Sequence, residues 1–369
     1  MTQVEEPLKR HPKLPVVDKG VKGIDPKFIS SLISKVEGVA SGTESKVDFW
    51  LDSGNYALNK VISGDYTRGL PFGRVIEVFG DPSTGKSLLI YHWIAAVQQM
   101  GGIAILDDTE DAYTEQFGAM LGIDSSALIL LSSLTVEEHF EKVFLGWKDS
   151  NGKSKPGLVD LIWEKDTECP ILIALDSLAL LSTRHEQEVM LEKPDMTKAK
   201  QIRAALRNSA RYMKKGNIMH VVANHVTTKI GVMFGNPKTT PGGSGMPFSA
   251  SVRLELNYSG KIKDVDNPDR VVGVMSTAKG SKNRIAMPFQ ESCLDIYFNK
   301  GVDPFSGLLE NMITNGIAKD GEKRGYVEIA GEQVRKSEFK EYVKKNLDRL
   351  SSLSTVAPVV EKVEEEEKD

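Results

Sequence analysis

Cysteine is scarce in this sequence, and long apolar runs are missing. Only Cys169 and Cys293 occur among 369 residues, too few and too far apart for a disulfide or metal framework. We expect each to be a small buried apolar residue, and the chain to work in a reducing, cytoplasmic compartment. No apolar stretch reaches the roughly 18 residues that a membrane-spanning helix needs. The polar residues 1–15 also lack the apolar core of a secretory signal.

A large excess of charge of one sign is also missing, because the formal net charge is −4. The distribution of charge is more informative than its sum. The 59 residues from Met196 to Leu254 contain no Asp or Glu, whereas the overall frequency of 51 in 369 would place about 8 there. The same stretch carries ten Lys or Arg. Residues 361–369 hold six acids and two lysines, which is typical of a solvated tail.

The apolar pattern predicts an α/β fold. Between residues 74 and 223, short strand patterns alternate with helical patterns, which implies right-handed crossovers and a mostly parallel sheet flanked by helices. Three later strand patterns follow one another closely and predict antiparallel hairpins at one end of the sheet. The expected strands are 74–79, 103–106, 128–131, 171–175, 219–223, 252–256, 271–277 and 293–298, and the main expected helices are 88–100, 136–147 and 196–215.

The strongest chemical signal is a glycine-rich loop between a strand pattern and a helical pattern. It fits G-x-x-x-x-G-K-[ST] in the context that this motif requires. Glycines let backbone N–H groups curl around phosphates, and the helix N-terminus adds partial positive charge. Lys86 is expected to pair with the β- and γ-phosphates of ATP, and Ser87 to ligate Mg²⁺; a chance turn is the alternative. The loop consists of Gly80, Asp81, Pro82, Ser83, Thr84, Gly85, Lys86 and Ser87.

Carboxylates follow two of the strand patterns. The apolar run 171–175 ends on Asp176, where a P-loop protein places the carboxylate that holds Mg²⁺ through water; capping of the strand is the alternative. A base that orients the attacking water is expected after the strand 103–106. Spacing alone does not choose among the four acids there, and ordinary loop acids are the alternative. The four are Asp107, Asp108, Glu110 and Asp111.

Several segments resemble one known family. Residues 229–243, KIGVMFGNPKTTPGG, are similar to the second DNA-binding loop of the bacterial RecA recombinases. Residues 69–80 resemble the lead into that family's P-loop, and residues 251–254 and 282–289 resemble its later segments. The resemblance covers roughly residues 50–300. It implies a RecA-like P-loop ATPase core that polymerises on single-stranded DNA and pairs it with homologous duplex DNA.

The resemblance also implies roles for single residues. It selects Glu110 as the base and places Phe117 against adenine. The resemblance also places Phe248 at a contact between subunits. It implies that Lys282 and Arg284 reach across this contact to the γ-phosphate bound by the neighbouring subunit; the alternative is that both are ordinary surface cations. The first DNA loop falls near residues 185–196, where the match is poor. In the second loop the implied DNA-binding residues are Lys229, Gly231, Val232, Met233, Phe234, Gly235, Asn236, Lys238, Gly242 and Gly243.

Two features depart from the family pattern. His225 stands where the family has a glutamine that senses the γ-phosphate. An imidazole can still donate to that phosphate, with a charge that varies with pH, whereas a satisfied histidine at a strand end is the alternative. The region after about Gly307 does not match the family's double-strand-binding domain. Both features suit a divergent or phage-like member.

The acid-free stretch contains a helical pattern with two faces. One face is apolar or small and is expected to meet the core: Ala199, Ile202, Leu206, Ser209 and Met213. The neighbouring face is basic, and both contact with DNA and simple solvation remain open for it: Lys200, Arg203, Arg207, Arg211 and Lys214.

We therefore predict four parts: a leader and oligomerisation segment (1–46), an ATPase core with DNA-binding loops (47–300), a small C-terminal region (301–355) and an acidic disordered tail (356–369). The predicted function is a DNA-dependent ATPase that uses ATP and Mg²⁺, forms filaments on single-stranded DNA and promotes strand exchange in recombinational repair. Single-strand-binding or loader proteins are possible further partners, and no membrane is expected. The alternatives are a ring-forming replicative DNA helicase and a non-catalytic ATP-binding regulatory protein.

Overall fold

The computed structural model describes residues 30–31, 34–35, 47–188, 197–228, 238–243 and 245–354. The chain divides into two units, residues 1–46 and 47–369, and the second contains the fold described below. In the sequence, Phe28, Leu32, Ile33 and Val36 recur at helical spacing, and all four lie outside the described residues. Among the described helices, none is long and apolar enough to cross a membrane.

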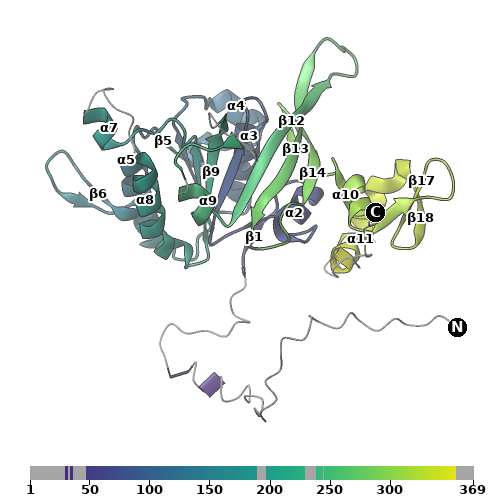
Figure 1. The fold of residues 1–369 in the computed structure, drawn as a ribbon, viewed down its shortest axis with the longest axis horizontal. Helices are drawn as coiled ribbons and strands as arrows, with labels where there is room; N and C mark the ends of the chain where they lie inside the picture. The colour runs from purple at the N-terminus through teal and green to yellow at the C-terminus, as the bar shows by residue number, and fades with distance from the viewer. Residues whose placement is uncertain are drawn as a thin grey trace, which may run out of the picture. The chain divides into compact units, whose positions relative to one another are not determined.

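A nine-stranded sheet forms the centre of the second unit (Figure 1), in the order β15-β14-β13-β12-β3-β9-β8-β4-β5. Neighbours from β12 to β5 run parallel, and those from β15 to β12 run antiparallel. The predicted mostly parallel sheet with hairpins at one end is confirmed. The strands are β3 (Arg74–Gly80), β4 (Ile103–Asp108), β5 (Leu128–Leu131), β8 (Ile171–Asp176), β9 (Ile218–His225), β12 (Val252–Lys263), β13 (Val271–Asn283), β14 (Glu291–Tyr297) and β15 (Gly301–Val302).

The parallel strands are apolar on both faces because each face packs against helices. On β8, Leu172 and Ala174 join a cluster with side chains of α2 and α3, whereas Ile173 and Leu175 join a cluster with side chains of α5 and α8. This alternation follows the two-residue period of a strand. The helices of this part are α2 (Tyr56–Ser63), α3 (Lys86–Gln99), α4 (Glu115–Met120), α5 (Val136–Phe140), α6 (Leu158–Trp163), α7 (Arg184–Glu188), α8 (Lys198–Met213) and α9 (Gly245–Ser249), with short turns η1 (Ser125–Ala127) and η2 (Glu141–Leu145).

The predicted helix over residues 136–147 is right up to Leu145 and wrong in its last two residues. After α5 the chain makes one π-helical turn, η2, and then turns out into a hairpin of β6 (Trp147–Lys148) and β7 (Ser154–Lys155). Gly146 allows this exit because its φ is +81°, and a Cβ there would lie 2.6 Å from the carbonyl oxygen of Lys155. Two more strand pairs are small: β1 (Trp50–Leu51) with β2 (Leu70–Pro71), and β10 (Thr227–Thr228) with β11 (Lys238–Thr239).

Helix α8 confirms the two predicted faces. The apolar positions Ile202, Leu206 and Met213 are buried, and the five basic positions are exposed. The prediction for the cysteines is half right. Cys169 is buried, but Cys293 is exposed because it lies on the outward face of β14, whose neighbouring positions point inward.

The C-terminal region folds on α2. A third apolar cluster combines Val327, Val343 and Leu350 with Ala57 and Tyr66, which lie on and just after α2. The elements of this region are α10 (Leu308–Thr314), β16 (Ala318–Asp320), β17 (Tyr326–Ile329), β18 (Glu332–Arg335), η3 (Lys336–Glu338) and α11 (Phe339–Ser354), with β16 to β18 forming an antiparallel sheet.

One buried amide joins α2 to the chain that enters this region. Asn55 is the N-cap of α2, and its Oδ1 accepts a hydrogen bond from the N–H of Leu58 at 2.7 Å. Its Nδ2 donates to the carbonyl oxygens of Asp303 at 2.8 Å and Ser306 at 3.0 Å. Asn55 therefore satisfies a helix end and two buried carbonyls at once.

We expect Asn55→Ala to lower the free energy of unfolding by about 2–3 kcal/mol, because it removes both the cap and the donors to two carbonyls. Thr114→Ala is the matched control. Thr114 caps α4 by accepting from the N–H of Phe117 and is exposed, so its loss should cost about 0.5–1 kcal/mol. Urea denaturation of both variants measures the difference. Equal losses would show that the bridge to Asp303 and Ser306 does not stabilise the fold.

Candidate nucleotide-binding site

The glycine-rich loop lies between β3 and α3, at the carboxyl edge of the parallel strands. Gly85 is the N-cap of α3 with a φ of +89°, and a Cβ there would lie 2.7 Å from Cδ1 of Ile296. Only glycine therefore fits without displacing that side chain. The hydroxyl of Ser276 on β13 donates to the carbonyl oxygen of Thr84 at 2.8 Å. The antiparallel part of the sheet thus holds the loop in place.

Lys86 begins α3 and is almost completely buried. Its Nζ donates to the carbonyl oxygens of Gly80 at 3.1 Å and Asp81 at 2.9 Å. An ammonium group has three donors, so one remains for a phosphate oxygen. Burial lowers the pKa of Lys86, and the nearby carboxylates of Asp176 and Glu110 oppose that shift. A phosphate beside this ammonium would favour its charged form further.

Asp176 ends β8 beside the loop and is 4% exposed. Burial raises its pKa, a hydrogen bond with the Ser87 side chain lowers it, and the charges of Glu110 and Asp108 raise it. Its Oδ1 is buried without a hydrogen-bond partner among the described residues. A carboxylate oxygen of this kind beside a hydroxyl fits the shell of a hydrated Mg²⁺. Ser87 and Asp176 would hold the ion, with phosphate and water oxygens completing its six ligands.

The four acids after β4 have different surroundings. Asp107 points to the opposite face of the sheet, where its Oδ2 lies 2.7 Å from Nδ1 of the buried His139. Asp108 accepts a hydrogen bond from the N–H of Tyr113 at 2.7 Å, and Asp111 is exposed. Among the four, only Glu110 lines the cavity that also contains Lys86 and Asp176. The geometry therefore favours Glu110 as the base.

His225 reaches the same cavity from the end of β9. Its Nε2 lies 2.9 Å from Oε1 of Glu110, and about a third of each side chain is exposed. The pair joins the ends of β4 and β9 across β8. The cavity has a volume of about 360 Å³. Its lining residues are Pro82, Ser83, Gly85, Lys86, Ser87, Leu88, Glu110, Asp176, His225, Val274 and Phe298.

Three lining residues were not expected from the sequence: Leu88, Val274 and Phe298. Val274 lies on β13 and Phe298 just after β14, and these antiparallel strands reach the loop because β12 pairs with β3. Phe298 gives the cavity an aromatic wall. Phe117, by contrast, does not line this cavity: it is half-buried, and its ring lies 5.9 Å from that of Tyr91. No local pattern in the sequence connects residue 298 to the loop, because the connection depends on strand order.

Comparison with known proteins gives a consistent result. A model of the RecA N-terminal domain family matches residues 16–303. Protein RecA 1 of Myxococcus xanthus is 32% identical over 345 residues, which cover 92% of each chain. Protein RecA of Thermus aquaticus is 35% identical over 250 residues, or 68% of each chain. Protein RecA from a strain of Thermus thermophilus is 32% identical over 319 residues, or 86% of each chain.

The chain belongs to the RecA family. Membership supports a general role in recombination and DNA repair for a protein that binds ATP and DNA. The predicted family is confirmed.

The second DNA-binding loop of a RecA protein falls here on residues that are only partly described. Lys229 and residues 231–236 lie outside the described residues, and of Lys238 only the backbone in β11 is described. The pairing of β10 with β11 brings the two ends of the loop together. Gly242 and Gly243 follow in a turn with φ values of +91° and +63°. In the first loop, His185 lies in α7, and residues 189–196 are outside the described residues.

A buried polar network lies under the base of the second loop. Glu77 on β3 is fully buried, and its carboxylate accepts from Nδ2 of Asn224 at 3.0 Å and from Nε of Arg253 at 2.5 Å. The same Asn224 Nδ2 lies 3.3 Å from the carbonyl oxygen of Pro241, and Arg253 donates to Oγ1 of Thr240 at 3.3 Å. Residues 240–241 are thereby tied to the strand that leads into the P-loop.

The residues expected at a RecA subunit contact lie near one another. Phe248 on α9 is 68% exposed. Lys282 has hydrogen-bond partners within its own chain. Its Nζ donates to the carbonyl oxygens of Pro247 at 2.6 Å, Phe248 at 3.1 Å and Ala250 at 2.7 Å, because the last carbonyls of a helix lack partners within it. Burial, with the nearby charge of Arg284, lowers the pKa of Lys282 to about 8. Arg284 is exposed, and no side-chain partner for it occurs among the described residues.

Proposed function

We propose that this RecA-family chain is a DNA-dependent ATPase that forms filaments on single-stranded DNA and promotes homologous pairing and strand exchange, in the cytoplasm. The observation that carries the proposal is one cavity that contains Lys86, Ser87, Asp176, Glu110 and His225. It lies at the end of β9, and the predicted second DNA loop begins just after that strand.

Each residue of the cavity has a separate proposed role in ATP hydrolysis. The loop backbone and Lys86 bind the β- and γ-phosphates, and Ser87 and Asp176 hold Mg²⁺, which neutralises charge that develops on the phosphate oxygens. Glu110 orients the attacking water and accepts its proton. His225 Nε2, which lies against Glu110, is placed to donate to the γ-phosphate.

The buried polar network connects the nucleotide cavity to the base of the second DNA loop. The backbone N–H of His225 donates to Oδ1 of Asn224 at 3.0 Å. Asn224 in turn contacts Glu77 and the carbonyl oxygen of Pro241. A shift of His225 toward a γ-phosphate would therefore move groups that hold the base of the second loop. ATP would stabilise the DNA-binding state, and hydrolysis would release it.

Electron microscopy tests the proposal against its rivals. With Mg²⁺, a slowly hydrolysed ATP analogue and single-stranded DNA, we expect helical filaments, and a strand-exchange assay should convert homologous but not unrelated duplex. Closed rings would indicate a helicase. The absence of both assembly and ATPase activity would indicate a regulatory protein that only binds ATP.

Glu110→Gln should slow ATP hydrolysis by about 10²- to 10⁴-fold while ATP and DNA binding persist, because an amide cannot accept the proton. Asp107→Asn is the matched control, since Asp107 lies on the same strand end but faces His139. It should lower stability and leave most of the hydrolysis rate per folded molecule. ATPase assays with thermal denaturation separate the two effects. A larger catalytic loss in Asp107→Asn would show that Glu110 is not the base.

Arg284 is proposed to complete the nucleotide site of a neighbouring copy, because its exposed guanidinium has no partner in the described part of its own chain. Lys86→Ala and Arg284→Ala should each be inactive alone. Mixed on single-stranded DNA, they should regain part of the ATPase activity, since some interfaces then combine an intact loop with an intact arginine. A second mixture combines Lys86→Ala with the double variant Lys282→Ala/Arg284→Ala. Any further loss of ATPase activity relative to the first mixture measures the contribution of the contact between Lys282 and α9. Co-assembly without recovery would place Arg284 outside the neighbour's site.

A further inference from the structure

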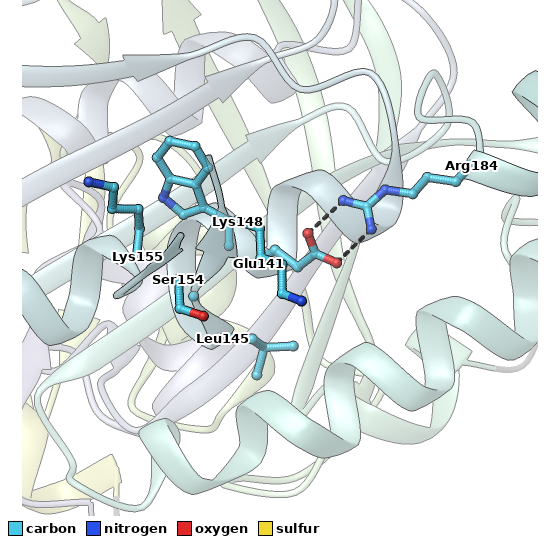
Figure 2. Close-up of a pocket in the computed structure, with 8 residues that line it drawn as sticks. Glu141, Leu145, Lys148, Ser154, Lys155 and Arg184 are labelled. Carbon is cyan, nitrogen blue, oxygen red and sulfur yellow. Dashed lines mark hydrogen bonds and ion pairs between the residues drawn. The ribbon is translucent and has the colours of Figure 1, made fainter. Parts of the chain in front are cut away.

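A second hollow lies where the β6–β7 hairpin meets η2 and α7. Its volume is about 530 Å³. Figure 2 shows Lys148, Ser154 and Lys155 on the hairpin side and Arg184 reaching Glu141 from the other side. A neighbouring hollow of about 330 Å³ shares Trp147, Lys148 and Arg184 with it and extends to Gln187 of α7. The roles assigned above to the nucleotide site and the two loops use none of these side chains.

The two acids nearest the hairpin, Glu141 and Asp149, each lie beside a cation of the chain, whereas Glu137 of α5 and Glu186 and Glu188 of α7 have no ion pair among the described residues. Glu141 accepts two hydrogen bonds from the guanidinium of Arg184, at 2.8 and 2.5 Å. Asp149, the single acid between residues 147 and 155, accepts from backbone N–H groups of the turn, and its Oδ2 lies 3.5 Å from Nζ of Lys155. Lys148 and Lys153 are exposed and have no ion pair among the described residues. The hairpin therefore presents two uncompensated positive charges.

An exposed aromatic ring lies next to these charges in the sequence and lines both hollows. Trp147 is 38% exposed, whereas Trp93 is fully buried and Trp50 and Trp163 are half-buried. A large ring left in solvent beside unpaired lysines suits a polyanion that also carries flat apolar faces. Single-stranded nucleic acid has both properties, because its bases stack on aromatic side chains while its phosphates meet cations.

The position of the hollow supports the same ligand. Arg184 and Gln187 belong to α7, the segment that runs directly into the stretch where the first DNA loop is expected. A backbone bridge between Thr135 and Ser182 holds the start of α5 beside the start of this segment. A DNA strand bound to that part of the molecule would thus have the hairpin within reach.

We propose that the β6–β7 hairpin is an additional contact for single-stranded DNA, with Trp147 stacking on a base and Lys148 and Lys153 binding phosphates. The Arg184–Glu141 pair holds η2 against α7 and so fixes the wall on which the hairpin stands. This contact rests on the proposed function, since it adds to the DNA site of the same filament.

The test measures binding of the full chain to a labelled oligo(dT) by fluorescence anisotropy, with Mg²⁺ and a slowly hydrolysed ATP analogue, over a range of salt concentrations. Trp147→Ala should weaken binding by about 10-fold, and Trp147→Phe should retain most of the affinity because a phenyl ring still stacks. DNA should quench tryptophan fluorescence in the wild type and clearly less in Trp147→Phe. Lys148→Gln/Lys153→Gln should reduce the slope of log affinity against log salt by about 1.4, at about 0.7 for each lost phosphate contact.

Lys165→Gln/Lys215→Gln is the matched control. Both lysines are exposed and precede β8 and β9, so they lie at the opposite edge of the sheet from the P-loop. This variant should bind oligo(dT) like the wild type, with the same salt slope. Circular dichroism and binding of the ATP analogue confirm that each variant is folded.

Three outcomes overturn the proposal. If the hairpin variants bind oligo(dT) with the same affinity and the same salt slope as the control variant, the hairpin does not contact DNA. The proposed DNA-binding function would still be supported in that case. Hairpin variants that bind a short oligonucleotide normally but form shorter filaments assign the hairpin to contact between copies. An equal loss in Trp147→Phe and Trp147→Ala excludes stacking as the role of the ring. A wild-type chain that fails to bind oligo(dT) at any salt concentration would instead reject the proposed function itself.

Discussion

The parallel hydrogen bonding of β3, β9, β8 and β4 is the constraint on which the rest of the structure depends. Parallel strands present their carboxyl ends at one edge, so the groups that follow them meet in space although they lie far apart in the chain. Lys86 follows β3, Asp176 ends β8, Glu110 follows β4 and His225 ends β9. A slip of one residue in any of these pairs would turn a functional side chain to the opposite face of the sheet.

Asp107 and Asp108 show how much that register decides. They are adjacent in sequence but face opposite layers. Asp108 pairs in register with Asp176 at the cavity edge, and Asp107 enters the other layer to meet His139. Burial raises the pKa of Asp107, but the hydrogen bond and charge of His139 and the hydrogen bonds with Ser133 together leave it below the ordinary value. Complete burial holds the pKa of the adjacent His220 well below its usual value. The polar groups of this layer thus pair with one another, whereas those of the cavity layer face the proposed nucleotide site.

The buried charges of the cavity suit an anion bound together with a cation: Lys86 calls for an anion and Asp176 for a cation. Lys86 is buried but has only backbone carbonyls as hydrogen-bond partners among the described residues, and Asp176 is buried there with one oxygen unpaired. Burying charges without full compensation is costly, and a ligand that supplies the missing partners offsets that cost. The hairpin differs, because its one acid, Asp149, lies beside Lys155, and Lys148 and Lys153 face water.

The sequence by itself determined the features that depend on local pattern. The glycine-rich loop needs fixed residue types at fixed spacing, the strands need short apolar runs, and the basic face of α8 needs only helical periodicity. Tertiary structure decided the rest. The spacing of the acids left Glu110 and Asp107 open, and although the family resemblance selected Glu110, the physical reason lies in the strand register, which turns Asp107 to the other layer. The aromatic wall at Phe298 required the pairing of β12 with β3. The carbonyl partners of Lys282 required the end of α9, more than thirty residues away. The predicted helix stops at Leu145, and the chain turns into the β6–β7 hairpin because Gly146 adopts a positive φ there, which a hydrophobic pattern does not encode.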